Sequence, residues 1–104
     1  MGRYPPAVFR MTVQDVFHIR NRGVVATGRV ESGSVRVGDV VQISGGPEAV
    51  VKGIEVFRKS IQEASTGDNI GVLLRDVDKS QLSAGAVLTS PGAADAGEGV
   101  AIVI

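Results

Sequence analysis

Three glycines at five-residue intervals interrupt a valine-rich stretch, and this pattern most restricts what the chain can fold into. In residues 24–43, β-branched side chains recur at two-residue spacing, and Gly28, Gly33 and Gly38 divide the run. An α-helix is excluded here, because each glycine costs about 1 kcal/mol relative to alanine and valine loses χ1 freedom. Short β-branched runs bounded by glycine are typical of closely connected antiparallel strands. We therefore expect hairpin reversals at residues 31–34 and 37–39.

The apolar residues elsewhere also follow strand periodicity. Phe9, Met11 and Val13 alternate onto one face, and the alternation then slips by one residue near Asp15, which predicts a β-bulge. Gly53, inside a strand expected over 49–57, predicts a second bulge or close approach. Turns or loops are expected at 20–23, 44–48 and 66–68, and a loop with one helical turn at 58–64. Residues 69–75 predict a buried central strand, 76–84 a connection with a helical turn, and 86–89 a final strand.

These segments amount to about seven or eight strands, with no helix longer than two turns. Turn signals every 8–12 residues favour an all-β fold, a small closed antiparallel β-barrel, over a sandwich. We expect one domain in the 104 residues: a leading segment over 1–8, the barrel over 9–92 and a tail over 93–104. The apolar residues 100–104 could add a strand to the barrel edge, dock on a partner or promote aggregation, and the sequence leaves these alternatives open.

Charge and composition exclude some classes of partner. Eleven basic residues balance eleven acidic ones, so no global attraction to nucleic acid or a membrane surface is expected. Residues 1–59 carry nine Lys or Arg and five Asp or Glu, whereas 60–104 carry two and six, which permits a local basic face. Charged side chains scattered over the solvated surface would give the same counts of basic and acidic residues. The absence of cysteine excludes disulfides, and no apolar run approaches the roughly 20 residues of a membrane span; we expect a cytoplasmic protein.

The sequence contains none of the common catalytic motifs. The phosphate-binding pattern G-x-x-x-x-G-K-[ST] does not occur, and His18 is the only histidine, so Ser-His-Asp triads and His-based zinc sites lack their parts. Asp39, Asp76 and Asp78 lack the glycine and glutamate of a calcium loop and are interpreted as solvated loop acids. We expect no catalytic residue, no cofactor and no metal site.

Residues 55–59, which read EVFRK, are the best candidate for binding. In a continuous strand, Glu55, Phe57 and Lys59 would share one face. An aromatic ring beside cations suits stacking on a base and contact with phosphate, as single-stranded nucleic acid requires. Spacing alone favours a simpler interpretation, in which Phe57 belongs to the core and the charges around it are solvated.

Several linked motifs resemble domain 2 of bacterial elongation factor Tu. The runs 15–33, 53–59 and 67–75 read DVFHIRNRGVVATGRVESG, GIEVFRK and GDNIGVLLR, and VGD at 37–39, GAVL at 85–88 and PG at 91–92 follow the same order. The resemblance spans residues 9–92, and such a set is far more specific than any single motif. It implies the β-barrel of translation factors.

The resemblance also implies a site for the 3′-terminal adenosine of aminoacyl-tRNA and its esterified amino acid. The matching positions are Ile19 and Val25 as pocket walls, Glu55 against the adenosine, Phe57 and Arg58 beside the acceptor end, Asn69 near the aminoacyl group, and Leu73 behind the base. Arg20 and Arg22 complete the RNA-binding set as cations of the 20–23 turn. One departure is Asn21, which stands where the family has glycine and would narrow the site.

Two classes of function follow from this comparison. The first is a stand-alone binding module related to translation elongation. It would bind the 3′ aminoacyl end of tRNA weakly, with aminoacyl-tRNA or ribosomal RNA as partner. The sequence holds no counterpart of the family's GTP-binding or third domain, so we expect no GTPase activity and a GTPase domain supplied by another chain. The second is a protein-interaction or ribosome-docking barrel that uses the tail or the Arg20–Arg22 tip. A third possibility is that the chain is an excised fragment of a larger factor.

Overall fold

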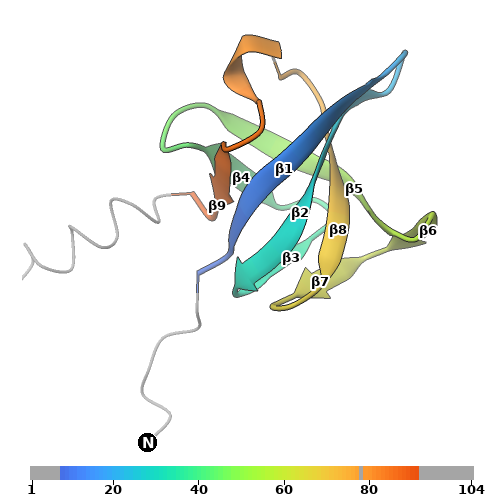
Figure 1. Ribbon diagram of the computed structural model, residues 1–104, viewed down its shortest axis with the longest axis vertical. Helices are drawn as coiled ribbons and strands as arrows, with labels where there is room; N and C mark the ends of the chain where they lie inside the picture. The colour runs from blue at the N-terminus through green and yellow to red at the C-terminus, as the bar shows by residue number, and fades with distance from the viewer. Residues whose placement is uncertain (1–7, 78, 92–104) are drawn as a thin grey trace, which may run out of the picture.

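The computed structural model describes residues 8–77 and 79–91, so the predictions for 1–7 and for the tail lie outside the described residues. Figure 1 shows a small all-β body. Within the described ranges the elements are β1 (Arg10–Ile19), β2 (Gly23–Ser32), β3 (Ser34–Arg36), β4 (Val40–Ile43), β5 (Glu48–Val56), β6 (Lys59–Ile61), β7 (Glu63–Ser65), β8 (Asn69–Leu74), the 3₁₀ helix η1 (Lys79–Gln81) and β9 (Val87–Thr89). No described helix is long and apolar enough to cross a membrane.

The main sheet closes on itself. Its strand order is β4-β9-β1-β2-β8-β5-β6, and an additional pairing joins β4 to β5, so six strands form a hydrogen-bonded ring. Every pairing in the ring is antiparallel. β6 extends outward from β5, and β3 pairs with β7 in a separate two-stranded sheet. The expected all-β, antiparallel fold is confirmed.

The ring is filled by aliphatic side chains from alternate strand positions. In β8, for example, Ile70, Val72 and Leu74 are buried, whereas the residues between them face outward. No described polar side chain is buried, so the core is held by apolar burial without internal ion pairs. The largest fully buried side chains are Met11, Ile43, Ile54, Leu74 and Leu88.

Two register shifts lie where the sequence predicted them. The β1–β2 ladder shifts between Val13 and Asp15, which keeps Asp15 out of the core that Met11 and Val13 enter. The β5–β8 ladder shifts between Val51 and Gly53. Both bulges are therefore confirmed, and each changes which side chains of the strand face outward.

Two turns share one local geometry, one between β3 and β4 and the other between β7 and β8. In each, a glycine with positive φ precedes an aspartate: Gly38 (100°) before Asp39, and Gly67 (97°) before Asp68. Each aspartate Oδ2 accepts a hydrogen bond at 2.9 Å from the backbone N–H three residues earlier. The reversal predicted at 37–39 is therefore confirmed, and local sequence explains it.

The hairpin expected at residues 31–34 is wrong. Gly33, with φ of 65°, bends the chain between β2 and β3, but these two strands do not pair. Both edges of β2 are already occupied, by β1 and by β8, so the chain must leave the ring and pair elsewhere. β3 finds its partner in β7.

The loop expected at residues 58–64 is also wrong, because most of it forms β6 and β7. These strands have three residues each, which is too short for a visible alternation of polar and apolar side chains. The helical turn expected in 76–84 is confirmed as η1, directly before the buried Leu82.

Candidate functional site

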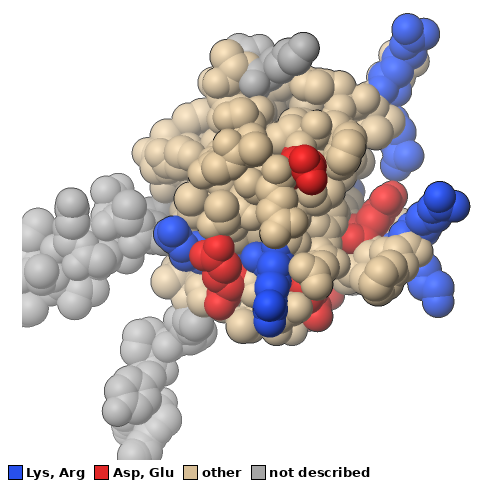
Figure 2. All heavy atoms as spheres, viewed as in Figure 1, with Lys and Arg blue, Asp and Glu red and all other residues tan. Residues whose placement is uncertain are grey.

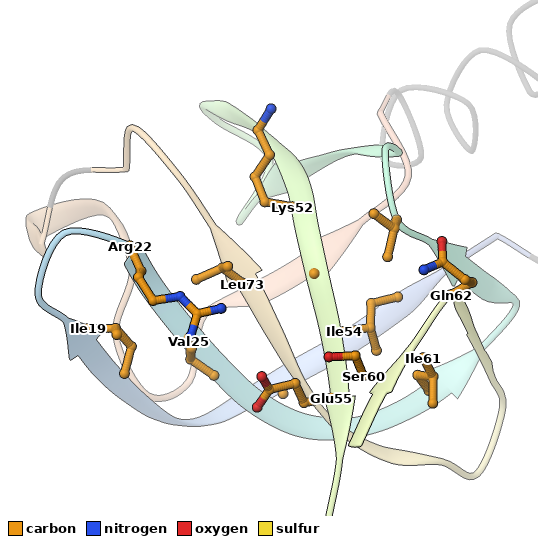
Figure 3. Close-up of a pocket in the computed structure, with 13 residues that line it drawn as sticks. Ile19, Arg22, Val25, Lys52, Ile54, Glu55, Ser60, Ile61, Gln62 and Leu73 are labelled. Atoms are coloured by element: carbon orange, nitrogen blue, oxygen red, sulfur yellow. The ribbon is translucent and has the colours of Figure 1, made fainter. Parts of the chain in front are cut away.

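A hollow of about 300 Å³ lies on the outer face of the ring, over β2, β8 and β5. Figure 3 shows side chains converging on it from the β1–β2 turn and from β2, β5, β6 and β8. Its walls combine aliphatic and polar side chains from segments far apart in sequence. The lining residues are Ile19, Arg22, Val25, Val37, Lys52, Gly53, Ile54, Glu55, Ser60, Ile61, Gln62, Gly71 and Leu73.

Two glycines on adjacent strands make the floor concave. Neither Gly53 nor Gly71 has a positive φ, so backbone conformation does not demand glycine at either position. A Cβ on Gly71 would lie 3.1 Å from Cγ1 of Val25, and one on Gly53 would lie 3.6 Å from Cβ of Leu73. What these glycines provide is space above the sheet.

Arg22 enters the hollow because of how the β1–β2 turn is built. Its N–H donates to the Ile19 carbonyl at 3.0 Å, and Asn21 and Gly23 adopt positive φ values of 65° and 135°. The turn predicted at 20–23 is thus confirmed. Nε of Arg75 donates to the Arg22 carbonyl at 3.3 Å and ties the turn to the end of β8.

Arg22 and Glu55 give the hollow one cationic and one anionic group. Both side chains point into it from different elements (Figure 3), and no ion pair joins them among the described residues. A guanidinium binds phosphate or carboxylate, whereas a carboxylate accepts hydrogen bonds from hydroxyl or amino groups. The hollow can therefore hold a ligand that carries both kinds of group.

The structure brings five of the nine predicted binding residues together. Ile19, Arg22, Val25, Glu55 and Leu73 all line the hollow. Val25 and Leu73 are directly paired across β2 and β8, which places two aliphatic walls side by side. As predicted, β8 is a central strand, with β2 on one side and β5 on the other. Its outer face is only partly buried, because Gly71 and Leu73 border the hollow.

The other four predicted residues lie around the hollow without lining it. Arg20 is exposed on the same turn as Arg22. Asn69 is exposed at the start of β8, where it pairs with Arg29, and it lies two residues before Gly71 on the same face. Phe57 and Arg58 form the tip of the β5–β6 hairpin.

Two expectations for Phe57 are wrong. The strand ends at Val56, so Phe57 does not alternate onto one face with Glu55 and Lys59. Phe57 and Arg58 instead form the two-residue loop of a hairpin, with φ values of 51° and 67°. The interpretation of Phe57 as a core residue is also wrong, because its side chain is 92% exposed.

Basic side chains gather at two projecting tips. Figure 2 shows Lys and Arg atoms extending at the ends of the β1–β2 turn and the β5–β6 hairpin, with acidic atoms between them. The sequence places Arg20 and Arg22 at the first tip and Arg58 and Lys59 at the second. The chain has no net charge, yet these cations flank the side of the hollow that Glu55 lines.

Sequence reasoning missed the far wall of the hollow, formed by Val37, Ser60, Ile61 and Gln62. These residues belong to the β3–β4 turn and to the segment expected to be a loop. No periodic signal marks a three-residue strand, so nothing in the pattern placed them beside β5. In the described part of the chain, no group of three or more His, Cys, Asp or Glu side chains could hold a metal ion.

A closed ring of antiparallel strands with a hollow of about 300 Å³ on its outer face defines the molecule as a small all-β module. The family model for elongation factor Tu domain 2 matches residues 23–89, well over half of the chain. The chain belongs to the elongation factor Tu domain 2 family. It is a translation-factor-like β module, and the match includes β2, β5 and β8, the three strands beneath the hollow.

Proposed function

We propose that this module binds the 3′ aminoacyl end of tRNA and has no GTPase activity of its own. The observation that carries the proposal is the convergence of Ile19, Val25, Glu55 and Leu73. The family resemblance assigned these four residues to one adenosine pocket, and they line one hollow although they come from four separate segments.

The chemistry of the hollow supports a nucleoside ligand. Ile19, Val25 and Leu73 offer aliphatic surfaces to the faces of a base, and Glu55 can accept a hydrogen bond from ribose or an exocyclic amine. Arg22 can contact a neighbouring phosphate. A volume of about 300 Å³ is at the lower limit for ligand pockets, which suits one nucleoside at the end of a chain.

The proposed interaction is weak and needs other contacts to become stable. Arg20, Arg22 and Arg58 are the cations expected to reach phosphates, and so few contacts give modest affinity at physiological salt. We infer that the remaining grip on tRNA, and any GTP hydrolysis, come from a GTPase domain that lies outside these 104 residues. Aminoacyl-tRNA or ribosomal RNA in the cytoplasm is the proposed partner, and the non-catalytic character of domain 2 in its family supports the absence of enzyme activity.

Fluorescence anisotropy with a labelled, aminoacylated RNA minihelix ending in CCA tests the proposal. Leu73→Ala removes one wall, and we expect it to weaken binding by about tenfold, since burying such a side chain is worth roughly 1.5–3 kcal/mol. Val40→Ala is the matched control, because Val40 is a 37% exposed valine of β4 that does not line the hollow. Equal affinity of the wild type and Leu73→Ala would contradict the proposal.

The exposure of Phe57 favours a second candidate, a protein-interaction or ribosome-docking module. A 92% exposed aromatic at a projecting tip is the kind of residue that anchors an interface. Ribosome co-sedimentation distinguishes the two functions. Loss of ribosome binding in Phe57→Ala, with the minihelix unable to bind the wild type, would favour docking over recognition of the RNA end.

A further inference from the structure

Aliphatic side chains form walls of the outer hollow on both sides of β5. They are those of Ile19, Val25, Val37, Ile54, Ile61 and Leu73. In Figure 3, Val25 and Leu73 lie on one side of the β5 ribbon and Ile61 lies on the other. Gly53 contributes no side chain to the floor between them. An aliphatic occupant would therefore remove apolar surface from water on more than one side.

The same chain contains a short segment of matching chemistry. Residues 100–104, called here the apolar segment, read VAIVI, and four of these five residues are β-branched and favour an extended conformation. In an extended chain, Val100, Ile102 and Ile104 share one face. Such a face gains free energy when it packs on another apolar surface.

The outer surface of β4 and β5 connects the end of β9 with the hollow. Thr89 lies opposite Gln42 in the antiparallel β4–β9 pair, so the chain beyond Thr89 runs along β4 toward Val40. Val40 pairs directly with Val50 of β5, and these two valines are 37% and 36% exposed. Lys52, two residues after Val50, already lines the hollow. A chain that leaves β9 therefore meets apolar surface on its way to the hollow.

Residues 92–99 are long enough to cover this distance. They read GAADAGEG, and eight residues span up to about 26 Å when extended. The crossing from β9 to β5 takes two strand spacings, about 10 Å, and the three residues from Val50 to Gly53 add about 10 Å. A short tether also raises the effective concentration of its segment to the millimolar range. Even a weak contact between the apolar segment and the hollow is therefore populated.

The charges of the two parts are complementary. Residues 92–104 contain Asp95 and Glu98 and no lysine or arginine. The hollow is lined by two basic residues and one acidic residue, so it is cationic overall. Figure 3 shows Lys52 at the opposite end of the hollow from Glu55, which is the end that the chain from β9 reaches first. Glu98 directly precedes the apolar segment by two residues and can pair with Lys52 there.

We propose that the apolar segment occupies the outer hollow of its own chain and competes there with RNA. Val100, Ile102 and Ile104 face the aliphatic walls, and Glu98 stays near Lys52 at the entrance. The docking depends only on the segment and the hollow, whereas the competition rests on the proposed function. The hollow is then in equilibrium between a self-occupied state and a state that receives the RNA end.

Methyl NMR spectra of the full-length chain without RNA test the docking. Ile102→Asn removes the central aliphatic side chain of the segment, so the methyl signals of Val25 and Leu73 should move. Val103→Asn is the matched control, because Val103 is the next residue and lies on the opposite face of an extended chain. Its spectrum should match that of the wild type at these methyl groups. Identical signals of Val25 and Leu73 in the wild type and Ile102→Asn would overturn the inference.

Dilution distinguishes docking within one chain from docking between two copies. A tethered segment gives the same spectrum at all protein concentrations, so the difference between the wild type and Ile102→Asn should persist after a tenfold dilution. A difference that disappears on dilution would show that the segment of a second copy fills the hollow, and would overturn the inference in favour of self-association.

Anisotropy with the aminoacylated CCA minihelix tests the competition. If the segment occupies the hollow for about two-thirds of the time, the apparent Kd of the wild type is about three times the intrinsic one. Ile102→Asn should therefore bind the minihelix about threefold more tightly than the wild type, and Val103→Asn should bind like the wild type. Both variants add the same uncharged side chain, so a general electrostatic effect on RNA is excluded.

The outcomes separate this inference from the proposed function. Equal affinity of the wild type and Ile102→Asn for the minihelix would overturn the competition and leave recognition of the RNA end standing. If neither the wild type nor Ile102→Asn binds the minihelix, the proposed function and the competition both fail, and the methyl spectra still decide whether the segment docks.

Discussion

Phe57 and Arg58 are consecutive residues that both have positive φ, 51° and 67°, between the paired residues Val56 and Lys59. Positive φ at both central positions defines a type I′ hairpin turn, in which asparagine and glycine are the preferred residues. A left-handed conformation costs a residue with a side chain roughly 1–2 kcal/mol. The chain thus places an exposed aromatic and a cation where local conformation disfavours them, as functional sites do.

Replacing the pair by Asn-Gly should stabilise the protein and weaken its binding. The double variant Phe57→Asn, Arg58→Gly relieves the left-handed strain, so we expect an unfolding free energy higher by about 1–2 kcal/mol. The melting temperature should rise by several degrees in a domain of this size. Loss of the ring and the guanidinium should lower affinity for the minihelix. A less stable variant, or one with unchanged affinity, would show that the tip is not shaped for binding.

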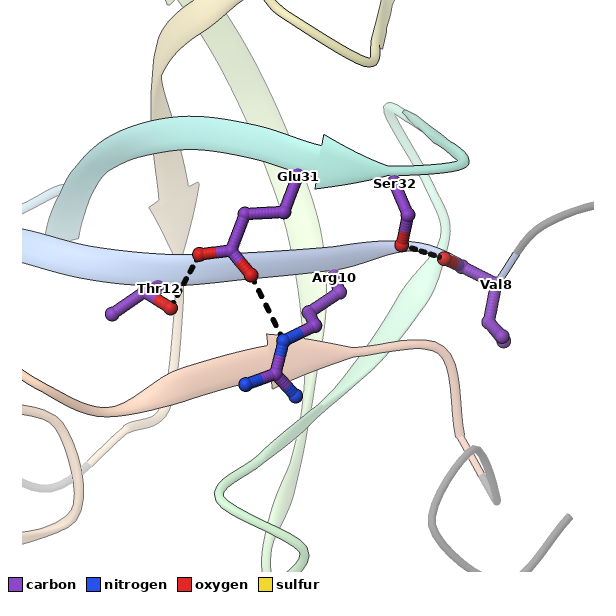
Figure 4. A network of polar contacts seen from close by, with 5 residues as sticks. All are labelled: Val8, Arg10, Thr12, Glu31 and Ser32. Carbon is purple, nitrogen blue, oxygen red and sulfur yellow. Dashed lines mark hydrogen bonds and ion pairs between the residues drawn. The ribbon is translucent and has the colours of Figure 1, made fainter. Parts of the chain in front are cut away.

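Glu31 should stay ionised to a lower pH in the folded protein than in the unfolded chain. The hydroxyl of Thr12 donates to its Oε2 at 2.6 Å and Nε of Arg10 donates to its Oε1 at 2.9 Å, as Figure 4 shows. The Thr12 hydrogen bond first, and then Arg10, lower the pKa of Glu31 below its ordinary 4.5. Because the folded pKa is depressed, the stabilisation is present above about pH 4.5 and is lost as pH falls through the folded pKa.

An NMR titration of the Glu31 side-chain carboxyl carbon measures this effect directly. Thr12→Val removes the hydroxyl and keeps the shape of the side chain, so the pKa of Glu31 should rise toward 4.5 in that variant. Thr27→Val is the control, because the hydroxyl of Thr27 bonds to the Asp15 carbonyl instead. A pKa of Glu31 that is the same in the wild type and Thr12→Val would assign the shift to another cause.

Gly28→Ala should destabilise the ring strongly. A Cβ at Gly28 would lie 2.4 Å from the Thr12 carbonyl oxygen and 3.2 Å from Cγ of Met11, and backbone cannot move aside cheaply in a closed ring. We expect a loss of about 1–3 kcal/mol in denaturant unfolding, as for other overpacked sites. Gly53→Ala, with no contact closer than 3.6 Å, is the comparison and should fall within about 0.5 kcal/mol of the wild type. Equal stability of the two variants would contradict the close approach of the Thr12 backbone to Gly28.

The salt dependence of RNA binding should report the arginines at the two tips. If Arg20, Arg22 and Arg58 contact phosphates, affinity falls steeply with salt, and removing one of them should lower the log–log slope by about 0.7. Arg36→Ala is a control, since Arg36 lies 3.9 Å from Glu63 and does not line the hollow. If the affinity of the wild type for RNA did not change with salt concentration, the proposed phosphate contacts would be contradicted.

The parts of the fold predictable from sequence are those with a local or periodic cause. The slip at Asp15 follows from broken alternation, and the bulge at Gly53 follows from a glycine inside a strand. The turn at Gly38 follows from glycine before aspartate. Strand pairing was not predictable in the same way. Gly33 indicates a reversal of the chain, but it does not show whether the strands before and after it pair with each other. They do not pair, because both edges of β2 are already occupied by other strands.

The same distinction, between features with a local or periodic cause and features set by strand pairing, applies to the candidate site. The residues on long strands that the resemblance named, such as Val25 and Leu73, line the hollow. Phe57 was misplaced because an extended strand and a tight hairpin read alike over EVFRK, and only φ at the tip distinguishes them. Gln62 was missed because the short strands β6 and β7 carry no periodic signal, although their position completes the hollow.

Chemical-shift mapping with an aminoacylated CCA minihelix tests the central claim most directly, that the outer hollow receives the RNA end. Titrating isotopically labelled protein at millimolar RNA should shift the signals of Ile19, Val25, Glu55 and Leu73 together, along one saturation curve. Val40, on the outer face of β4 away from the hollow, should not shift. Shifts confined to residues outside the hollow, or none at all, would contradict the account.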